Sequence, residues 1–404
     1  MARGISCRGG ACPASPIRKL VPIAERVKSK GKKVYHLNIG QPDIKTPDIF
    51  WQALISYPSK VLAYGNSQGE TDFRASLSRY YTEFCDIELN PDEIIVTTGG
   101  SEAIIFAMLT TSDPGDNFIV FEPFYTNYNG YAVMADVSLK PIPTNPQTGY
   151  HLPEREVIES AIDNRTRGII ICSPNNPTGT VLTLEEMNLV KELALKYDLF
   201  VISDEVYREF AYEYKPISVM HIPELQERAI LLDSISKRFS ACGARIGNIA
   251  TKNKDIIASA LRFGQARLCP PRIEQFAAKA ILDNLKPEYF VELRQEYMRR
   301  RDAALEELAK IPGVFCQKPS GAFYLMVKLP ISDTDDFAEW LLADYDEDGE
   351  TVMVAPGAGF YATKGLGKSE VRIAYVLEEN ELRKAIRIFG RGLERYREIK
   401  EGDD

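Results

Sequence analysis

The chain has 404 residues, a hydrophobic content of 45% and a formal net charge of −8. This acidic balance disfavours nucleic acid or anionic lipid as the main partner. No apolar run reaches the roughly 18 residues that a membrane span needs, and residues 1–20 lack the apolar segment of a secretory signal. We therefore expect a cytoplasmic protein with no membrane partner and no nucleic-acid partner.

The cysteines and histidines argue against disulfide and metal chemistry. Seven cysteines are scattered without a CxxC pair, which favours reduced thiols. His36, His151 and His221 are the only histidines and lie far apart in the sequence, so neither a histidine metal site nor a Ser-His-Asp triad has support. We expect no metal site.

The middle of the chain alternates short β-branched runs with helical patterns. Such alternation is typical of βαβ units and of a mainly parallel sheet that is covered on both faces. A helix is predicted over 184–197, where Thr183 followed by Glu186 has the spacing of a capping box. The predicted strands are 93–97, 118–121, 168–172, 200–203, 230–234 and 247–251.

The pattern changes after about residue 295. A charged helix over 297–308 is followed by a predicted strand pair, 323–327 with 351–354, then by a strand over 371–375 and a helix that continues through Tyr396. This part is predicted to be a separate α+β domain. Its core is expected to include the N-terminal stretch, because the apolar run 34–39 is isolated by Gly and Pro. The predicted division is 1–48, 49–295 and 296–404.

Four polar motifs follow predicted strands. Ligands of open parallel sheets gather at the carboxyl ends of strands, so these motifs are expected to form one shared site. The motifs are GGSEA at 99–103, SPNNPTG at 173–179, SDEVY at 203–207 and SISKRFSACGARIG at 234–247.

Lys237 lies in the last of these motifs, among groups that bind phosphate. Ser234 and Arg245 offer a hydroxyl and a guanidinium. Gly99 and Gly100 lead into an apolar helix over 104–110, whose free backbone N–H groups would favour an anion. A phosphate beside a lysine amine suggests a phosphorylated aldehyde. The alternatives are a surface lysine and an ordinary strand-to-helix turn.

Asp204 follows the buried run FVIS, where a carboxylate is costly without a positive partner. A protonated pyridine nitrogen would be such a partner. Tyr207 and Asn176 could bind a phenolate oxygen of the same ring, and Tyr125 could stack on it. The alternative is that Asp204 pairs with a core arginine and that both tyrosines are ordinary packing residues.

Together these motifs resemble the class I/II aminotransferases of pyridoxal-phosphate (PLP) fold type I, in particular the aspartate aminotransferase-like branch. The resemblance implies an α/β fold: a large domain with a mainly parallel seven-stranded sheet between helices, and a smaller α+β domain built from both termini. It is carried, in the family's order, by NIGQPD at 38–43, Tyr64 with Gly69, GGSEA, SPNNPTG, SDEVY, the SxSK stretch with Arg245, VAPGAGF at 354–360 and RIAY at 372–375.

The resemblance also implies a role for each matching residue. Lys237 would hold PLP as a Schiff base and act as the general base, Asp204 would face the pyridine nitrogen, and Tyr125 would stack on the ring. Tyr207 and Asn176 would bind the 3-oxygen, and Arg372 would bind the substrate α-carboxylate with help from Asn176 and the Gly40 backbone. The phosphate would be bound by Ser234, Arg245, the backbone of Gly100, Ser101 and Glu102, and Tyr64 from the partner subunit of a homodimer.

The implied reaction moves an amino group from an L-amino acid to a 2-oxo acid such as 2-oxoglutarate, in ping-pong order. Aspartate is the first candidate donor. In strictly dicarboxylate-specific members, an arginine five residues before an NPP triplet reads the distal carboxylate; here the triplet is CPP at 269–271 and the position is Gly264. Arg262, Arg267 or another basic side chain would have to substitute. Alanine, aromatic or broad specificity stays open, as does a β-lyase reaction with the same cofactor.

Two rival classes have less support. GLGKS at 365–369 resembles part of a P-loop, but Ala362 stands where that motif needs a glycine. A regulator built on an aminotransferase domain would need an added DNA-binding segment, for which the chain has neither the length nor the basic charge.

Overall fold

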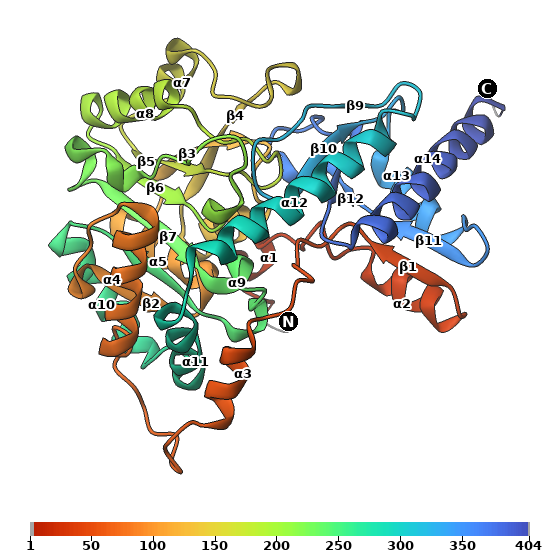
Figure 1. Ribbon diagram of the computed structural model, residues 1–404. Helices are drawn as coiled ribbons and strands as arrows, with labels where there is room; N and C mark the ends of the chain where they lie inside the picture. Colours follow the sequence, from red (N-terminus) through yellow and green to blue (C-terminus); the bar gives the residue numbers. More distant parts are fainter. Residues whose placement is uncertain (1–3, 403–404) are drawn as a thin grey trace.

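The computed structural model describes residues 4–402 and arranges the central strands in one sheet (Figure 1). Residues 1–3 and 403–404, at the outer ends of the predicted N-terminal segment and C-terminal domain, lie outside the described residues. The strands are β2 (Ile94–Thr97), β3 (Asn117–Glu122), β4 (Ser138–Pro143), β5 (Thr166–Cys172), β6 (Phe200–Asp204), β7 (Ala229–Ser234) and β8 (Gly247–Ala250).

The strand order is β2-β8-β7-β6-β5-β3-β4, and only β8 runs antiparallel to its neighbours. The prediction of a mainly parallel seven-stranded sheet is therefore confirmed. All six strands predicted from β-branched runs are present, within two residues at each end. β4, which contains Pro141 and Pro143, was not predicted. An edge strand tolerates proline because one row of its backbone groups needs no partner, and β4 pairs only with β3.

Alternate residues of the central strands face opposite sides of the sheet, and helices cover both. Ile170 packs on one side with α5 (Gly99–Thr111), α6 (Asn127–Ala135) and α10 (Lys254–Arg267). Ile169 and Ile171 pack on the other side. That side is covered by α4 (Thr71–Cys85), α7 (Arg155–Ala161), α8 (Leu184–Lys196) and α11 (Arg272–Asp283).

The capping box at the start of α8 is confirmed. Thr183 Oγ1 accepts the backbone N–H of Glu186 at 3.2 Å, and Glu186 Oε2 accepts the N–H of Thr183 at 2.7 Å. The predicted apolar helix after β2 is also present, but α5 begins at Gly99, so both glycines lie in its first turn.

The C-terminal part contains two small sheets. The first consists of β9 (Phe315–Cys316), β10 (Tyr324–Lys328), β12 (Ala355–Pro356) and β13 (Glu370–Ala374), in the order β12-β13-β10-β9. The second is formed by β1 (Lys33–His36) and β11 (Glu350–Met353), which pair in parallel. The predicted pairing of 323–327 with 351–354 is therefore wrong. β11 takes a partner from the other end of the chain, while β10 pairs with β13 and β9.

Helices join the two parts of the chain. The long helix α12 (Pro287–Leu308) begins well before the predicted start at residue 297, runs through residue 295 and packs against α14 (Glu379–Gly402). α2 (Val21–Ser29) packs against β1 and α13 (Thr334–Ala343). No helix in residues 4–402 is both long and apolar enough to cross a lipid bilayer.

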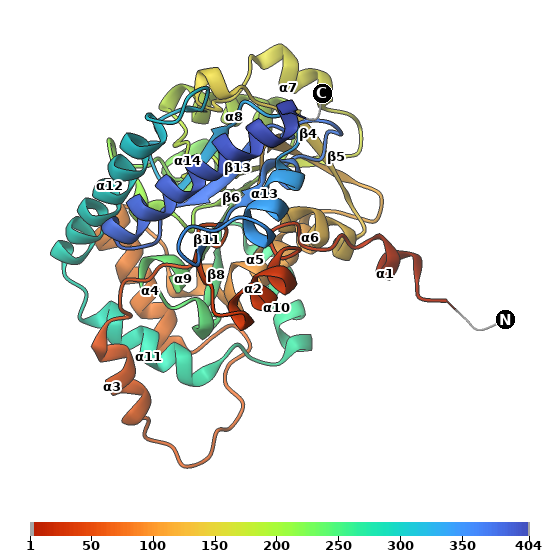
Figure 2. The same ribbon diagram turned by 90° about the vertical axis from the view of Figure 1, so that its right-hand side faces the viewer.

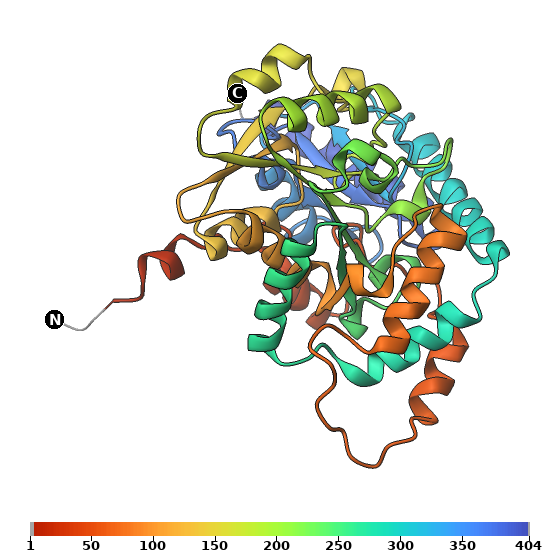
Figure 3. The ribbon, with the colours of Figure 1, turned by 90° about the vertical axis from the view of Figure 1, so that its left-hand side faces the viewer.

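Two segments project from the body of the molecule (Figures 2 and 3). One is the N-terminal arm with α1 (Cys7–Ala11). The other is the connection between α3 (Asp48–Ile55) and α4, which contains Tyr64.

Candidate active site

A cavity of about 530 Å³ lies at the carboxyl ends of the central strands, where the four polar motifs meet residues of the C-terminal part. Of the predicted site residues, Glu102 and Tyr64 do not line it. Glu102 accepts the Thr98 N–H at 2.8 Å, and Tyr64 is 79% exposed on its projecting connection. The predicted residues that line the cavity are Gly40, Gly100, Ser101, Tyr125, Asn176, Asp204, Tyr207, Ser234, Lys237, Arg245 and Arg372.

Asp204, the last residue of β6, has no cationic partner in the described part of the chain. Its carboxylate accepts the Tyr128 hydroxyl at 2.7 Å and the Val206 N–H at 3.3 Å. Burial raises the pKa of Asp204 to about 6. A buried carboxylate of this kind is stabilised when a cation approaches it from the cavity.

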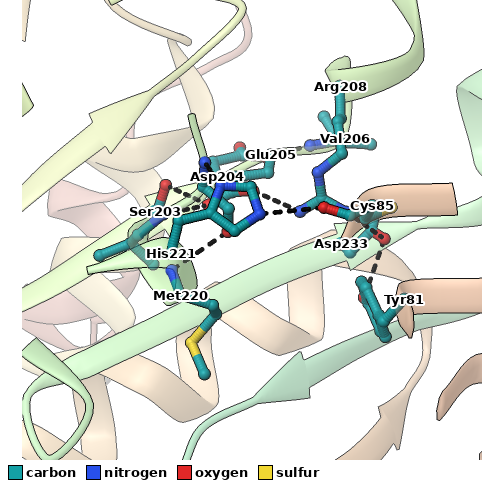
Figure 4. A network of polar contacts seen from close by, with 12 residues as sticks. Tyr81, Cys85, Ser203, Asp204, Glu205, Val206, Arg208, Met220, His221 and Asp233 are labelled. Atoms are coloured by element: carbon teal, nitrogen blue, oxygen red, sulfur yellow. Dashed lines mark hydrogen bonds and ion pairs between the residues drawn. The ribbon is translucent and has the colours of Figure 1, made fainter. Parts of the chain in front are cut away.

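The core arginine that could have paired with Asp204 pairs with its neighbour instead. Figure 4 shows Arg208 between Glu205 and Asp233. Arg208 donates to Glu205 and lies 3.9 Å from Asp233, which also accepts the Tyr81 hydroxyl at 2.9 Å. The charge of Glu205 is thus balanced within the core, and among the described residues no arginine pairs with Asp204.

Asn176 connects two predicted functional residues. Its Nδ2 donates to the Tyr207 hydroxyl at 3.2 Å, and its Oδ1 accepts from Arg372 Nη1 at 2.9 Å. The Tyr207 hydroxyl also lies 2.8 Å from that of Tyr324. These contacts hold an amide and two phenols in fixed positions on the cavity wall.

Arg372, in β13, is a buried guanidinium without a carboxylate partner in residues 4–402. It is 2% exposed, donates to the Asn38 carbonyl at 2.6 Å and leaves Nε without a hydrogen bond. The rings of Tyr324 and Phe360 lie 4.5 and 4.8 Å from its Cζ. Burial lowers its pKa. This geometry suits an incoming carboxylate.

Lys237 lies in α9 (Ile235–Arg238), the short helix that follows β7. Its Nζ donates to the Gly40 carbonyl at 2.7 Å. Ser234 caps this helix: its hydroxyl accepts the Ser236 N–H at 3.1 Å and donates to the Ile246 carbonyl at 2.8 Å. The amine therefore extends from a fixed helix toward the cavity.

The first turn of α5 lies beside Arg245 and β8 at very close range. A Cβ on Gly99 would lie 2.4 Å from Arg245 Nη2, and a Cβ on Gly247 would lie 2.7 Å from the Gly100 nitrogen. Gly99 also has a φ of +75°. Only glycine fits at these two positions, and the result is an N–H-rich turn with a guanidinium beside it. Such a turn is suited to a phosphate.

Three tyrosines that line the cavity, Tyr128, Tyr131 and Tyr324, were not predicted as site residues. Tyr128 and Tyr131 lie in α6 and Tyr324 lies in the apolar strand β10, and a tyrosine within a helix or strand is normally a packing residue. Gly40 offered an indirect signal, since a Cβ there would lie 1.7 Å from the Tyr324 hydroxyl. That constraint becomes visible only once β10 is placed beside the NIGQPD loop.

The structure also shows where the residues lie that were considered for binding a distal substrate carboxylate. Gly264 is buried in α10, and neither Arg262 nor Arg267 lines the cavity. Arg267 pairs with Glu102 at 3.4 Å, and Arg262 is exposed. A different basic residue, Arg18, lines the cavity from the N-terminal segment.

Comparison with known proteins agrees with this geometry. A family model described as "Aminotransferase class I and II" matches residues 32–389. The aspartate/prephenate aminotransferase of Thermus thermophilus is 33% identical, over 97% of this chain and 100% of the relative. The solved structure of aspartate aminotransferase from Thermus thermophilus with maleate has a TM-score of 0.87, with 29% identity, and covers 97% of this chain and 100% of its own.

An alanine aminotransferase from Pyrococcus furiosus also has a TM-score of 0.87, at 27% identity, and covers 97% of this chain and 100% of its own. Fold and cavity thus define a transaminase of PLP fold type I. The chain belongs to the class I and II aminotransferases, in the aspartate aminotransferase-like branch of this PLP-dependent family.

Proposed function

We propose that this enzyme transfers the amino group of an L-amino acid, with aspartate as the first candidate, to a 2-oxo acid such as 2-oxoglutarate. The observation that carries the proposal is Arg372, a buried guanidinium that lacks an anionic partner among the described residues and borders the same cavity as Lys237 and Asp204. The α-carboxylate common to amino acids and 2-oxo acids would supply that partner.

The cavity residues fit pyridoxal phosphate. The uncompensated carboxylate of Asp204 suits a protonated pyridine nitrogen, and the Asn176 and Tyr207 side chains suit the ring oxygen. Tyr125 would stack on the ring. The turn at Gly100 and Ser101, the Glu102 N–H, Arg245 and Ser234 would bind the phosphate, and Lys237 would hold the cofactor covalently as a Schiff base.

When bound, the cofactor supplies an aldehyde that carries the amino group between substrates and a ring that accepts electron density from Cα. Arg372, with Asn176, orients the substrate carboxylate. The Lys237 amine, when it is not bonded to the cofactor, would remove the proton from the substrate Cα as general base. Arg372 is the only cavity arginine in residues 4–402 that is buried beside Asn176, so the two substrates are expected to bind in turn, which gives ping-pong kinetics.

A panel of amino acids tests this proposal. Each is mixed with cofactor-loaded enzyme, and conversion of pyridoxal phosphate to pyridoxamine phosphate is followed by absorbance. Conversion that depends on the amino donor, and that is reversed by 2-oxoglutarate, is the expected result. Release of a leaving group without pyridoxamine phosphate would indicate a β-lyase and would overturn the proposal.

The glycine at 247 provides a test of the phosphate site. Gly247→Ala would place a methyl group 2.5 Å from Gly99 C and displace the turn, so it is expected to weaken pyridoxal-phosphate binding about 10-fold or more. Gly243→Ala is the matched control, because a Cβ there meets nothing within 4 Å. Cofactor affinity is measured by absorbance titration of the two folded variants. Equal affinities would contradict the phosphate assignment.

We further propose a cytoplasmic homodimer in which Tyr64 reaches the partner's cofactor. The support is that Tyr64 is 79% exposed and does not line the cavity of its own chain. Sedimentation of the active enzyme is expected to give a dimer. Full activity in a species that sediments as a monomer would refute this arrangement.

We also propose the division of the chain into 1–48, 49–295 and 296–404. The parallel pairing of β1 with β11 supports grouping the N-terminal segment with the C-terminal domain. Because α12 runs through residue 295, this helix would connect the two domains.

A further inference from the structure

One basic side chain of the cavity has no role in the proposed reaction. The cavity is bordered by Arg18, Lys237, Arg245 and Arg372. Lys237 serves as the base, Arg245 lies at the phosphate turn, and Arg372 receives the α-carboxylate. Arg18 comes from a different part of the chain, the segment just before α2.

The segment that bears Arg18 is fixed next to Arg372. The Ile17 carbonyl accepts from Asn38 Nδ2 at 3.5 Å, and the Asn38 carbonyl accepts from Arg372 Nη2 at 2.6 Å. Pro16 packs against Gly359 so closely that a Cβ on this glycine would lie 2.4 Å away. A substrate whose carboxylate binds Arg372 would therefore lie next to this segment.

The guanidinium of Arg18 is uncommitted. Arg18 is exposed where this segment lines the cavity, and its guanidinium makes no hydrogen bond or ion pair within residues 4–400, whereas the adjacent Lys19 pairs with Asp335. The side chains of the N-terminal segment that line the cavity with it are the apolar Ile17, Val21 and Ile39 and the polar Ser15 and Gln41. Asp204 is the only carboxylate among the described lining residues, and it is reserved for the cofactor ring. The wall therefore combines an apolar surface with one free positive charge.

We infer that Arg18 binds a carboxylate at the end of the substrate side chain, so that the enzyme selects dicarboxylic amino acids and 2-oxo acids. This inference rests on the proposed function and names its substrate class. Ile17, Val21 and Ile39 would contact the methylene groups of the side chain, while the planar guanidinium would pair with its carboxylate.

The test is the ratio of two specificity constants. The amino-donor half-reaction of the cofactor-loaded enzyme is measured with aspartate, glutamate, alanine and phenylalanine. In Arg18→Met, the ratio of kcat/KM for aspartate or glutamate to that for alanine is expected to fall about 10- to 100-fold, as for a lost hydrogen bond between charged groups. Arg26→Met is the matched control, since Arg26 is an exposed arginine of α2 that does not line the cavity.

Binding of maleate, an unreactive dicarboxylate, gives a second readout. Calorimetry is expected to show at least a 10-fold weaker Kd for maleate in Arg18→Met than in Arg26→Met. The inference would be overturned if Arg18→Met left the ratio of kcat/KM values unchanged, which includes an equal fall in kcat/KM for alanine and aspartate. Unchanged affinity for maleate would also overturn it. Failure of the wild type to transaminate any amino acid would instead refute the proposed function, so the two failures are distinguishable.

Discussion

Lys237→Ala is expected to abolish transamination and the absorbance of the lysine-bound cofactor. The amine that removes the Cα proton would be lost, and the expected fall in turnover is on the order of 10⁴-fold. Lys237 donates to the Gly40 carbonyl at 2.7 Å, so its removal also frees one backbone acceptor at the cavity. Single-turnover absorbance at a fixed amino-donor concentration measures both effects.

Lys254→Ala is the control for this variant, because Lys254 is exposed at the start of α10. It is expected to keep the wild-type spectrum and rate. If Lys237→Ala retained either the turnover or the lysine-bound absorbance, the assignment of Lys237 would be wrong.

Asp204→Asn is expected to change both activity and the pH dependence of stability. An amide cannot balance a positive charge on the ring nitrogen, so turnover should fall about 10²- to 10³-fold. Burial raises the pKa of Asp204 from 3.8 to about 6. In the cofactor-free protein, ionising this buried carboxylate opposes folding by about 3 kcal/mol.

The sign of the pH effect follows from the raised pKa. Below pH 4 the carboxyl is protonated in both the folded and the unfolded chain, so Asp204 does not affect the free energy of unfolding. Between about pH 4 and pH 6 the unfolded chain loses the proton first, and stability falls. Above pH 6 both chains have lost the proton, and the free energy of unfolding falls no further because of Asp204. Asp204→Asn should therefore be more stable than the wild type at pH 8 and equal to it at pH 4.

Urea denaturation of the two cofactor-free proteins at these two pH values measures the difference. Asp344→Asn serves as the control, because Asp344 is exposed and is expected to show no such pH-dependent gain. If Asp204→Asn raised the free energy of unfolding by the same amount at both pH values, Asp204 would not be an uncompensated carboxylate.

The central sheet could be predicted because its strands are buried on both faces. Runs such as GIIIC in β5 and AILL in β7 are continuous apolar segments, and polar motifs follow them closely. β4 could not be recognised from the sequence. An edge strand needs no continuous apolar run, and it can lack some backbone N–H groups because one side of it has no neighbouring strand. The partner of β11 could not be recognised either, since nothing local in its sequence specifies β1.

The residues of the cavity likewise include some that local sequence could predict and some that it could not. Residues within sequence motifs, such as Asp204 and Asn176, were recognisable because each motif directly follows a buried strand, which places it at the carboxyl end of the sheet. Tyr324 and Arg18 were not, because their place on the wall depends on contacts between distant segments: the close approach of Gly40 to Tyr324, and the link from Ile17 through Asn38 to Arg372.

The pairing of β1 with β11 has a consequence for biosynthesis. Lys33 pairs with Glu350, so roughly 300 residues must be translated before the first strand can find its partner. At about 5–20 residues per second, the emerging chain carries β1 unpaired for some 15 to 60 seconds. During that interval Tyr35 and Leu37, both fully buried in the finished enzyme, have no native core to enter. The N-terminal wall of the cavity is thus among the first parts to be synthesised and the last to be completed.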